Sequence, residues 1–123
     1  MQRTRYFWDA VIAIDPDAAT LDPRPHFPIC HPEPLGKLFR AAGLDEVAVE
    51  AIDLPMAFRD LDDFWLPHTM AGTAVAQRYV SGLDDERKAA LREQLRTTLP
   101  LAADGSLHLI DRAWAVRGTK RTG

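Results

Sequence analysis

Histidine and cysteine side chains near residue 30 are the first candidates for chemistry in this sequence. His26, Cys30 and His31 offer imidazole and thiol groups, which soft metal ions prefer as ligands. A structural zinc site needs four ligands, and no second pair stands nearby in the sequence. Cys30 could also be a nucleophile, but a neighbouring histidine in sequence does not make a catalytic pair in space. We therefore expect a buried or partly buried thiol and no metal site.

Three carboxylates form a second candidate group. Asp60, Asp62 and Asp63 could act as paired acids in acid–base catalysis. They directly precede Phe64 and Trp65, where the chain suits a short helix, and aspartates at a helix start accept hydrogen bonds from free N–H groups. We favour helix capping because it needs no further partner.

Aromatic side chains could line an apolar pocket for an aromatic or lipid-like substrate, because ligand pockets are mostly hydrophobic. The candidates are Tyr6, Trp8, Phe64 and Trp65. The same rings could instead pack together in the core of the protein, and we favour this second interpretation.

The clearest elements that could position these side chains are a helix and a strand between residues 31 and 54. Pro32 and Glu33 suit a first helical turn, and Gly43 suits a left-handed C-terminal cap. Residues 47–54 are rich in small and β-branched side chains, which predicts a strand. Pro55 predicts the end of that strand.

The remaining elements follow from hydrophobic spacing and turn residues. Apolar residues at helical spacing predict a helix over residues 3–14, and six prolines between residues 15 and 34 predict an irregular connection. Beyond residue 55 the sequence predicts a short helix ended by Pro67, a turn or two of helix over 74–80, a helix over 84–99, and a strand over 106–116.

Composition limits the kinds of protein that this can be. The chain has 123 residues, of which 46% are hydrophobic and 27% charged, as in an ordinary single globular domain. A net charge of −3 gives no general attraction to nucleic acid or to anionic lipid. One cysteine cannot form an internal disulfide, and no long apolar run predicts a signal peptide or a membrane helix. We expect a soluble, cytoplasmic protein.

The two predicted strands carry apolar residues on both faces. This pattern is typical of a sheet that is covered on both sides, and a two-stranded sheet is marginal by itself. We therefore expect the two strands to belong to a larger sheet.

Four stretches resemble one known family. They read FPICHPEPLGKLFRAAGLDEVAVEAIDL, FRDLDDFWLP, YVSGLDDERKAALREQLRTTLP and DGSLHLIDRAWAVRG. This pattern resembles the C-terminal half of class I S-adenosylmethionine-dependent methyltransferases that act on small molecules, and the likeness covers nearly the whole chain. The resemblance implies a partial Rossmann-like α/β fold, in which residues 47–54 form the sixth strand of a seven-stranded sheet. Residues 107–116 would form the antiparallel seventh strand beside it.

The same resemblance assigns roles to the other segments of a single domain over residues 1–123. Residues 1–15 would be the helix after strand five, residues 31–54 the helix–strand unit, residues 60–100 a helical lid over the substrate pocket, and residues 106–117 the last strand. His68 would then lie in the lid, where it could accept a proton from a hydroxyl or amine nucleophile during methyl transfer. The alternative is a solvent-exposed histidine in a loop.

The cofactor motif of the family is absent from the sequence. Class I enzymes hold S-adenosylmethionine with a glycine-rich turn and an acidic residue at a strand end, and no G-x-G occurs here. We expect a truncated or partial form that cannot bind the cofactor alone, so that any catalysis needs a partner chain. The alternative is a non-catalytic binding or self-assembly module, whose exposed sheet edge and apolar faces are covered by self-association.

Overall fold

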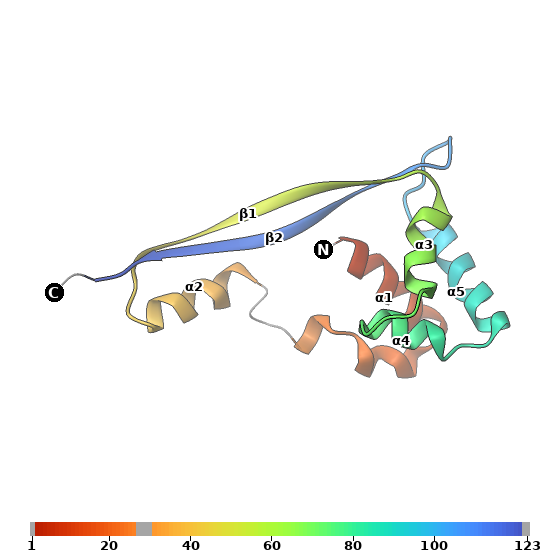
Figure 1. The fold of residues 1–123 in the computed structure, drawn as a ribbon, viewed down its shortest axis with the longest axis horizontal. Coiled ribbons are helices and arrows are strands. Elements are labelled where there is room, and N and C mark those ends of the chain that lie inside the picture. Colours follow the sequence, from red (N-terminus) through yellow and green to blue (C-terminus); the bar gives the residue numbers. More distant parts are fainter. Residues whose placement is uncertain (1, 27–30, 122–123) are drawn as a thin grey trace.

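The computed structural model describes residues 2–26 and 31–121 of the chain. In these residues the protein has a mixed α/β fold, in which several helices accompany one antiparallel sheet of two strands, β1 (Asp45–Phe58) and β2 (Leu107–Thr119). We call this strand pair the ribbon. Figure 1 shows that the ribbon joins two separate helical parts, with α2 (Pro32–Ala41) at one end and the other α-helices at the opposite end.

The larger helical part, which we call the helical head, contains α1 (Gln2–Ile14), α3 (Leu61–Thr69), α4 (Val75–Ser81) and α5 (Asp85–Thr98). Two short 3-10 helices, Pro16–Leu21 and Arg24–His26, follow α1. The head encloses the core, whose largest fully buried side chains are Trp8, Phe7, Phe64, Leu91, Leu95, Leu107, Val11 and Val80. The helices predicted over residues 3–14 and 84–99 bury apolar residues at helical spacing, such as Phe7 and Val11 of α1 and Leu91 and Leu95 of α5, whereas Ile14 at the end of α1 is 39% exposed.

Local capping explains where most helices begin and end. The side chains of Asp60 and Asp84 accept hydrogen bonds from the amides of Asp63 and Arg87, at 2.8 Å each, and so start α3 and α5. Gly43, with φ of 86°, follows α2 in the left-handed conformation that only glycine adopts without strain. The caps predicted at Asp60 and Gly43 are confirmed, and Asp84 starts the helix predicted over residues 84–99.

Two predictions based on proline are wrong. Pro55 does not end the first strand: β1 continues to Phe58, and Pro55 pairs with Ile110. Pro67 does not end α3, which continues to Thr69. Pro55 is tolerated because its backbone nitrogen faces away from β2. Pro67 lacks the N–H that a seventh helical residue would donate to the carbonyl of Asp63, and α3 continues past it for two residues only.

The ribbon is covered on different faces at its two ends. Near the helical head, Leu107, Leu109 and Asp111 of β2 are buried. At the other end the alternation is reversed, and Trp114 and Val116 are the partly buried residues. Side chains alternate between faces along a strand, so the head covers one face and α2 covers the other.

Close contact with α2 depends on glycine. Gly36 is the buried residue of α2, and a Cβ atom there would lie 3.3 Å from Cγ2 of Val49 in β1. A Cβ atom at Gly118 of β2 would lie 2.9 Å from Cβ of Leu44. A larger residue at Gly36 would therefore crowd Val49 beneath α2, and one at Gly118 would crowd Leu44 in the turn that follows α2.

Between its two covered ends the ribbon is largely exposed. We call residues 51–54 of β1 and 112–115 of β2 the bare midsection; all of them are exposed except Trp114, which is partly buried. The described chain contributes two strands to the sheet, and the larger covered sheet predicted from the apolar faces stays a prediction. The helical head and α2 each cover only the end of the ribbon that they contact.

Candidate functional site

Three of the four aromatic residues predicted as pocket candidates lie in the core of the helical head. Trp8, Phe64 and Trp65 are buried, and Phe64 packs edge-on against Phe58 of β1 with ring centroids 5.4 Å apart. Tyr6 is partly buried at the edge of this core, with the Arg5 guanidinium 5.1 Å from its ring centroid. The structure places these rings in packing, as the favoured interpretation predicted. Substrate contact by them stays a prediction.

His68 lies in the last turns of α3, not in a loop. Its ring stacks on Phe7 with centroids 4.5 Å apart, and its Nδ1 lies 3.0 Å from the carbonyl oxygen of Phe64. The Phe64 carbonyl can only accept, so Nδ1 carries the proton and Nε2 is left as the acceptor of the ring. Burial lowers the pKa of His68, which keeps the ring neutral at neutral pH. A neutral Nε2 is the form that a general base requires, and the catalytic role of His68 stays a prediction.

The other predicted groups have structural partners. Asp60 caps α3, Asp62 forms an ion pair with Arg92 at 2.8 Å, and Asp63 accepts a hydrogen bond from the Arg59 amide. The capping interpretation of these acids is confirmed for Asp60.

The predicted metal-ligand candidates are not brought together in the described chain. His26 lies in the second 3-10 helix, and its Nε2 is 3.3 Å from the carbonyl oxygen of Thr20. His31 occupies the N-cap position of α2, without a side-chain hydrogen bond to the helix. Cys30 lies outside the described residues. No three histidine, cysteine, aspartate or glutamate side chains within 2–26 and 31–121 are grouped as metal ligands.

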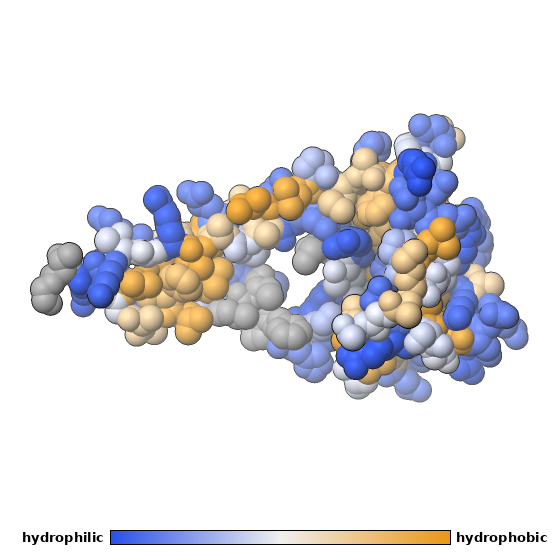
Figure 2. All heavy atoms as spheres, viewed as in Figure 1, coloured by the Kyte–Doolittle hydropathy of each residue, from blue (hydrophilic) through white to orange (hydrophobic). Residues whose placement is uncertain are grey.

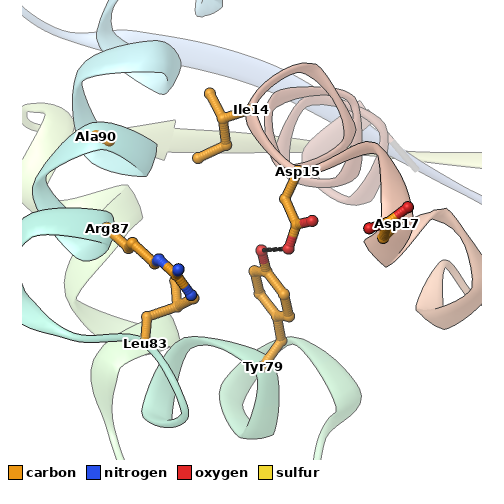
Figure 3. Close-up of a pocket in the computed structure, with 7 residues that line it drawn as sticks. All are labelled: Ile14, Asp15, Asp17, Tyr79, Leu83, Arg87 and Ala90. Atoms are coloured by element: carbon orange, nitrogen blue, oxygen red, sulfur yellow. Dashed lines mark hydrogen bonds between the residues drawn. The ribbon is translucent and has the colours of Figure 1, made fainter.

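A cavity of about 420 Å³ lies between α1, α4 and α5 (Figure 3). The Tyr79 hydroxyl donates a hydrogen bond of 2.8 Å to Oδ2 of Asp15, and the Arg87 side chain points into the same space. The other lining residues are Ile14, Asp17, Leu83 and Ala90. Burial, and then the hydrogen bond to Asp15, raise the pKa of Tyr79 to about 12. This phenol therefore holds its proton at neutral pH. Its hydrogen bond connects α4 to the residue that follows α1.

The sequence did not point to this cavity. Tyr79 and Asp15 lie 64 positions apart, and neither belongs to a motif. The only signal was the position of Tyr79 in the short helix predicted over residues 74–80.

The second candidate site is the surface of the ribbon. Ile52, Leu54 and Ile110 are 48%, 53% and 46% exposed. By the pairing of the strands, Ile52 and Leu54 lie on one face of the ribbon and Ile110 lies on the other. Figure 2 shows apolar side chains gathered along the ribbon between α2 and the helical head. On the face of Ile110 one ion pair crosses the ribbon, with Nε of Arg112 2.6 Å from Oδ1 of Asp53. Among the described residues of the ribbon no group is positioned for catalysis, and exposed apolar side chains in a continuous patch are typical of surfaces that contact another protein.

The two outer edges of the ribbon are chemically different. The amide of Ile110 donates a hydrogen bond of 2.8 Å to the side-chain oxygen of Gln2, so the backbone of Ile110 points away from β1. Pro55 is its cross-strand partner and faces outward on β1, where it has no N–H to donate. The edge of β1 is therefore interrupted at Pro55, and the edge of β2 is occupied by Gln2 at Ile110. Beyond this pair, residues 49, 51 and 53 of β1 and residues 112, 114 and 116 of β2 all direct their N–H and C=O groups outward.

One buried carboxylate beside this edge is only partly satisfied. Asp111 is buried on β2, and its Oδ2 lies 3.3 Å from the guanidinium of Arg3. Its Oδ1 is buried, and no donor among the described residues lies within hydrogen-bonding distance of it. Buried carboxylate oxygens are normally hydrogen-bonded, so among the described side chains the charge of Asp111 depends on its ion pair with Arg3.

Comparisons with known proteins give no relative for this chain. No family model matches it. No curated protein and no solved structure matches it either. In the part of the chain that the structure describes, no helix has the length and apolar character needed to cross a membrane.

Proposed function

We propose that this chain is the sheet-completing part of an S-adenosylmethionine-dependent methyltransferase that acts on a small molecule. The order of helix α2, strand β1 and antiparallel strand β2 agrees with the arrangement that the sequence resemblance implies. In this proposal the ribbon forms one side of a Rossmann-like sheet, and the remaining strands come from another polypeptide segment. The isolated chain binds no cofactor.

The observation that carries this proposal is the bare midsection. Its apolar side chains and outward-facing β2 backbone groups lack the covering that strands normally have on both faces. Adding strands at the β2 edge would supply hydrogen-bond partners for those groups. It would also create a sheet wide enough to be covered by further helices.

A complementation experiment tests this proposal. The chain is mixed with the glycine-rich half of a small-molecule methyltransferase, truncated after its fifth strand, and binding of S-adenosylhomocysteine is followed by calorimetry. We expect saturable binding by the mixture and none by either part. A mixture that binds no more than its parts would contradict the proposal, and so would saturable binding by this chain alone.

We propose a second function, a non-catalytic self-assembly module. The reason is that β2, whose outer edge is open, carries side chains of opposite charge. Asp111 and Arg117 project on the same face of β2, separated by six positions. Such a strand can pair favourably with an antiparallel copy of itself, and this function requires no cofactor.

A further inference from the structure

We propose that the cavity between α1, α4 and α5 binds a small zwitterion, a molecule that carries one carboxylate and one ammonium group on an apolar body. Arg87 receives the carboxylate and Asp15 receives the ammonium group (Figure 3). The lining residues come from the helical head and the segment after α1, not from the ribbon. This inference therefore goes beyond both functions proposed above, and its test needs neither a cofactor nor a second polypeptide.

Arg87 supplies the positive charge of the cavity. Its side chain points into the space from α5 (Figure 3), and no carboxylate in the described chain lies within ion-pairing distance of its guanidinium. The other two arginines of α5 are already engaged, because Arg92 pairs with Asp62 and Arg96 pairs with Glu93. The Arg87 guanidinium is therefore open to a ligand carboxylate, which it can bind through two parallel hydrogen bonds.

Asp15 supplies a negative charge from the segment that follows α1. Its Oδ2 accepts the Tyr79 hydroxyl at 2.8 Å, which leaves Oδ1 able to accept a hydrogen bond from an ammonium group. Asp17, from the same segment, also lines the cavity. An anion alone would face both aspartates, and a cation alone would face Arg87. A molecule that carries both charges therefore fits this lining best.

Tyr79 lies between the two charged groups and is held in place (Figure 3). Its hydroxyl is bonded to Asp15, and its ring packs near Trp8 of the core with centroids 6.1 Å apart. Burial raises the pKa of Tyr79 to about 12, as expected where water is partly excluded. Hydrogen bonds to charged groups are stronger in such surroundings, and a fixed wall lowers the cost of ordering a ligand against it.

The rest of the lining sets the size and polarity of the ligand body. Ile14, Leu83 and Ala90 offer apolar contact. The volume of about 420 Å³ lies toward the low end of the roughly 300–1,000 Å³ that is typical of ligand pockets. A free amino acid with an aliphatic side chain combines both charges with an apolar body, so leucine is a suitable probe.

Titration of the isotope-labelled full chain with leucine, followed by NMR, tests the site. Amide signals of residues 14–17, 79–83 and 87–90 should shift and saturate. N-acetylleucine lacks the ammonium group and leucinamide lacks the carboxylate, so each should bind at least roughly tenfold more weakly. The absence of saturable shifts with leucine would overturn the proposal. So would either analogue binding as tightly as leucine.

Arg87→Gln tests the assigned residue. It should weaken the binding of leucine by roughly tenfold or more and leave the weaker binding of leucinamide unchanged, because only leucine offers a carboxylate to this side chain. Arg92→Gln is the matched control on the same helix. It breaks the pair with Asp62, outside the cavity lining, and should change neither affinity. Circular dichroism checks that both variants remain folded.

Three outcomes with these variants would overturn the assignment. The first is an equal affinity for leucine in the unmodified chain and in Arg87→Gln. The second is a loss of leucinamide binding in Arg87→Gln, and the third is a loss of leucine binding that Arg92→Gln shares.

Discussion

The helical head and the bare midsection both contain large aliphatic side chains, but the head buries them and the midsection leaves them exposed. Leu91 and Leu95 of α5 are fully buried, whereas Leu54 and Ile52 of β1 are about half exposed. The difference is geometric: a helix needs one apolar stripe covered, but a strand pair has two faces and two edges to cover. In this chain the helices of the head bury their apolar faces against one another, and the ribbon has covering elements only at its ends.

The largest expected effect comes from truncating equivalent leucines in the two regions. Leu91→Ala should lower the free energy of unfolding by about 2–5 kcal/mol, because it leaves a cavity in the head. Leu54→Ala should change it by no more than about 0.5 kcal/mol, because that side chain is half exposed. Urea denaturation followed by circular dichroism measures both. Equal losses would mean that the ribbon is covered in solution, as it would be in an oligomer.

Removing a helix cap should have the next largest effect on the head. Asp84→Ala deletes the oxygen that accepts the Arg87 amide, which should lower the free energy of unfolding by about 1 kcal/mol. Asp84→Asn retains an acceptor and serves as the control. Similar losses in both variants would show that negative charge, and not the hydrogen bond, stabilises the start of α5.

Tyr79 should make unfolding sensitive to alkaline pH. Its folded pKa of about 12 lies above the ordinary value of 10.0, so the unfolded chain loses this proton first. Stability from this group is complete below the ordinary value and is lost as pH rises toward the folded one. Tyr79→Phe should remove this dependence. It should also cost about 1 kcal/mol at neutral pH through the lost hydrogen bond to Asp15.

His68 should lower the stability of the fold as the pH falls, whereas Tyr79 lowers it as the pH rises. Burial lowers its folded pKa below the usual 6.5, so the unfolded chain binds a proton that the folded chain rejects. Stability from the neutral ring is complete above the usual pKa and falls as pH drops toward the folded value. Urea midpoints between about pH 7 and pH 5 measure this slope. The slope should be smaller in His68→Gln, and an unchanged slope would place the acid sensitivity elsewhere.

The smallest effect is expected at the exposed ion pair of the bare midsection. Arg112 holds the pKa of Asp53 below its ordinary value by hydrogen bonding, but both side chains are open to solvent. Asp53→Asn should therefore leave the urea midpoint nearly unchanged, with any difference disappearing in high salt. A loss comparable with that of Asp84→Ala would indicate that the midsection is desolvated.

Local chemistry was predictable from the sequence in this protein. Asp60, Asp84 and Gly43 act on backbone groups within four residues, so their spacing alone predicted the helix ends. Pro55 shows the limit of that reasoning. Whether proline ends a strand depends on the direction in which its backbone nitrogen faces, and this is set by the pairing with Ile110, far along the chain.

The candidate sites were less predictable than the elements. The bond between Tyr79 and Asp15 and the incomplete partnering of Asp111 both depend on how distant segments meet. His68 was predicted as a functional residue because the resemblance places it in a lid over a substrate pocket, but its ring stacking on Phe7 depends on how α3 meets α1. Periodicity predicts faces, and it does not predict which side chains meet across elements.

The reversal of burial along β2 has a mechanical consequence. A two-stranded ribbon twists more strongly than a wider sheet, and α2 and the helical head are attached to opposite faces at its two ends. Added strands would flatten the ribbon, and α2 would then rotate relative to the head about the long axis of the strands. Spin labels on α2 and α5 would register this rotation as a change in the distance between them. That distance therefore reports whether further strands have paired with the ribbon.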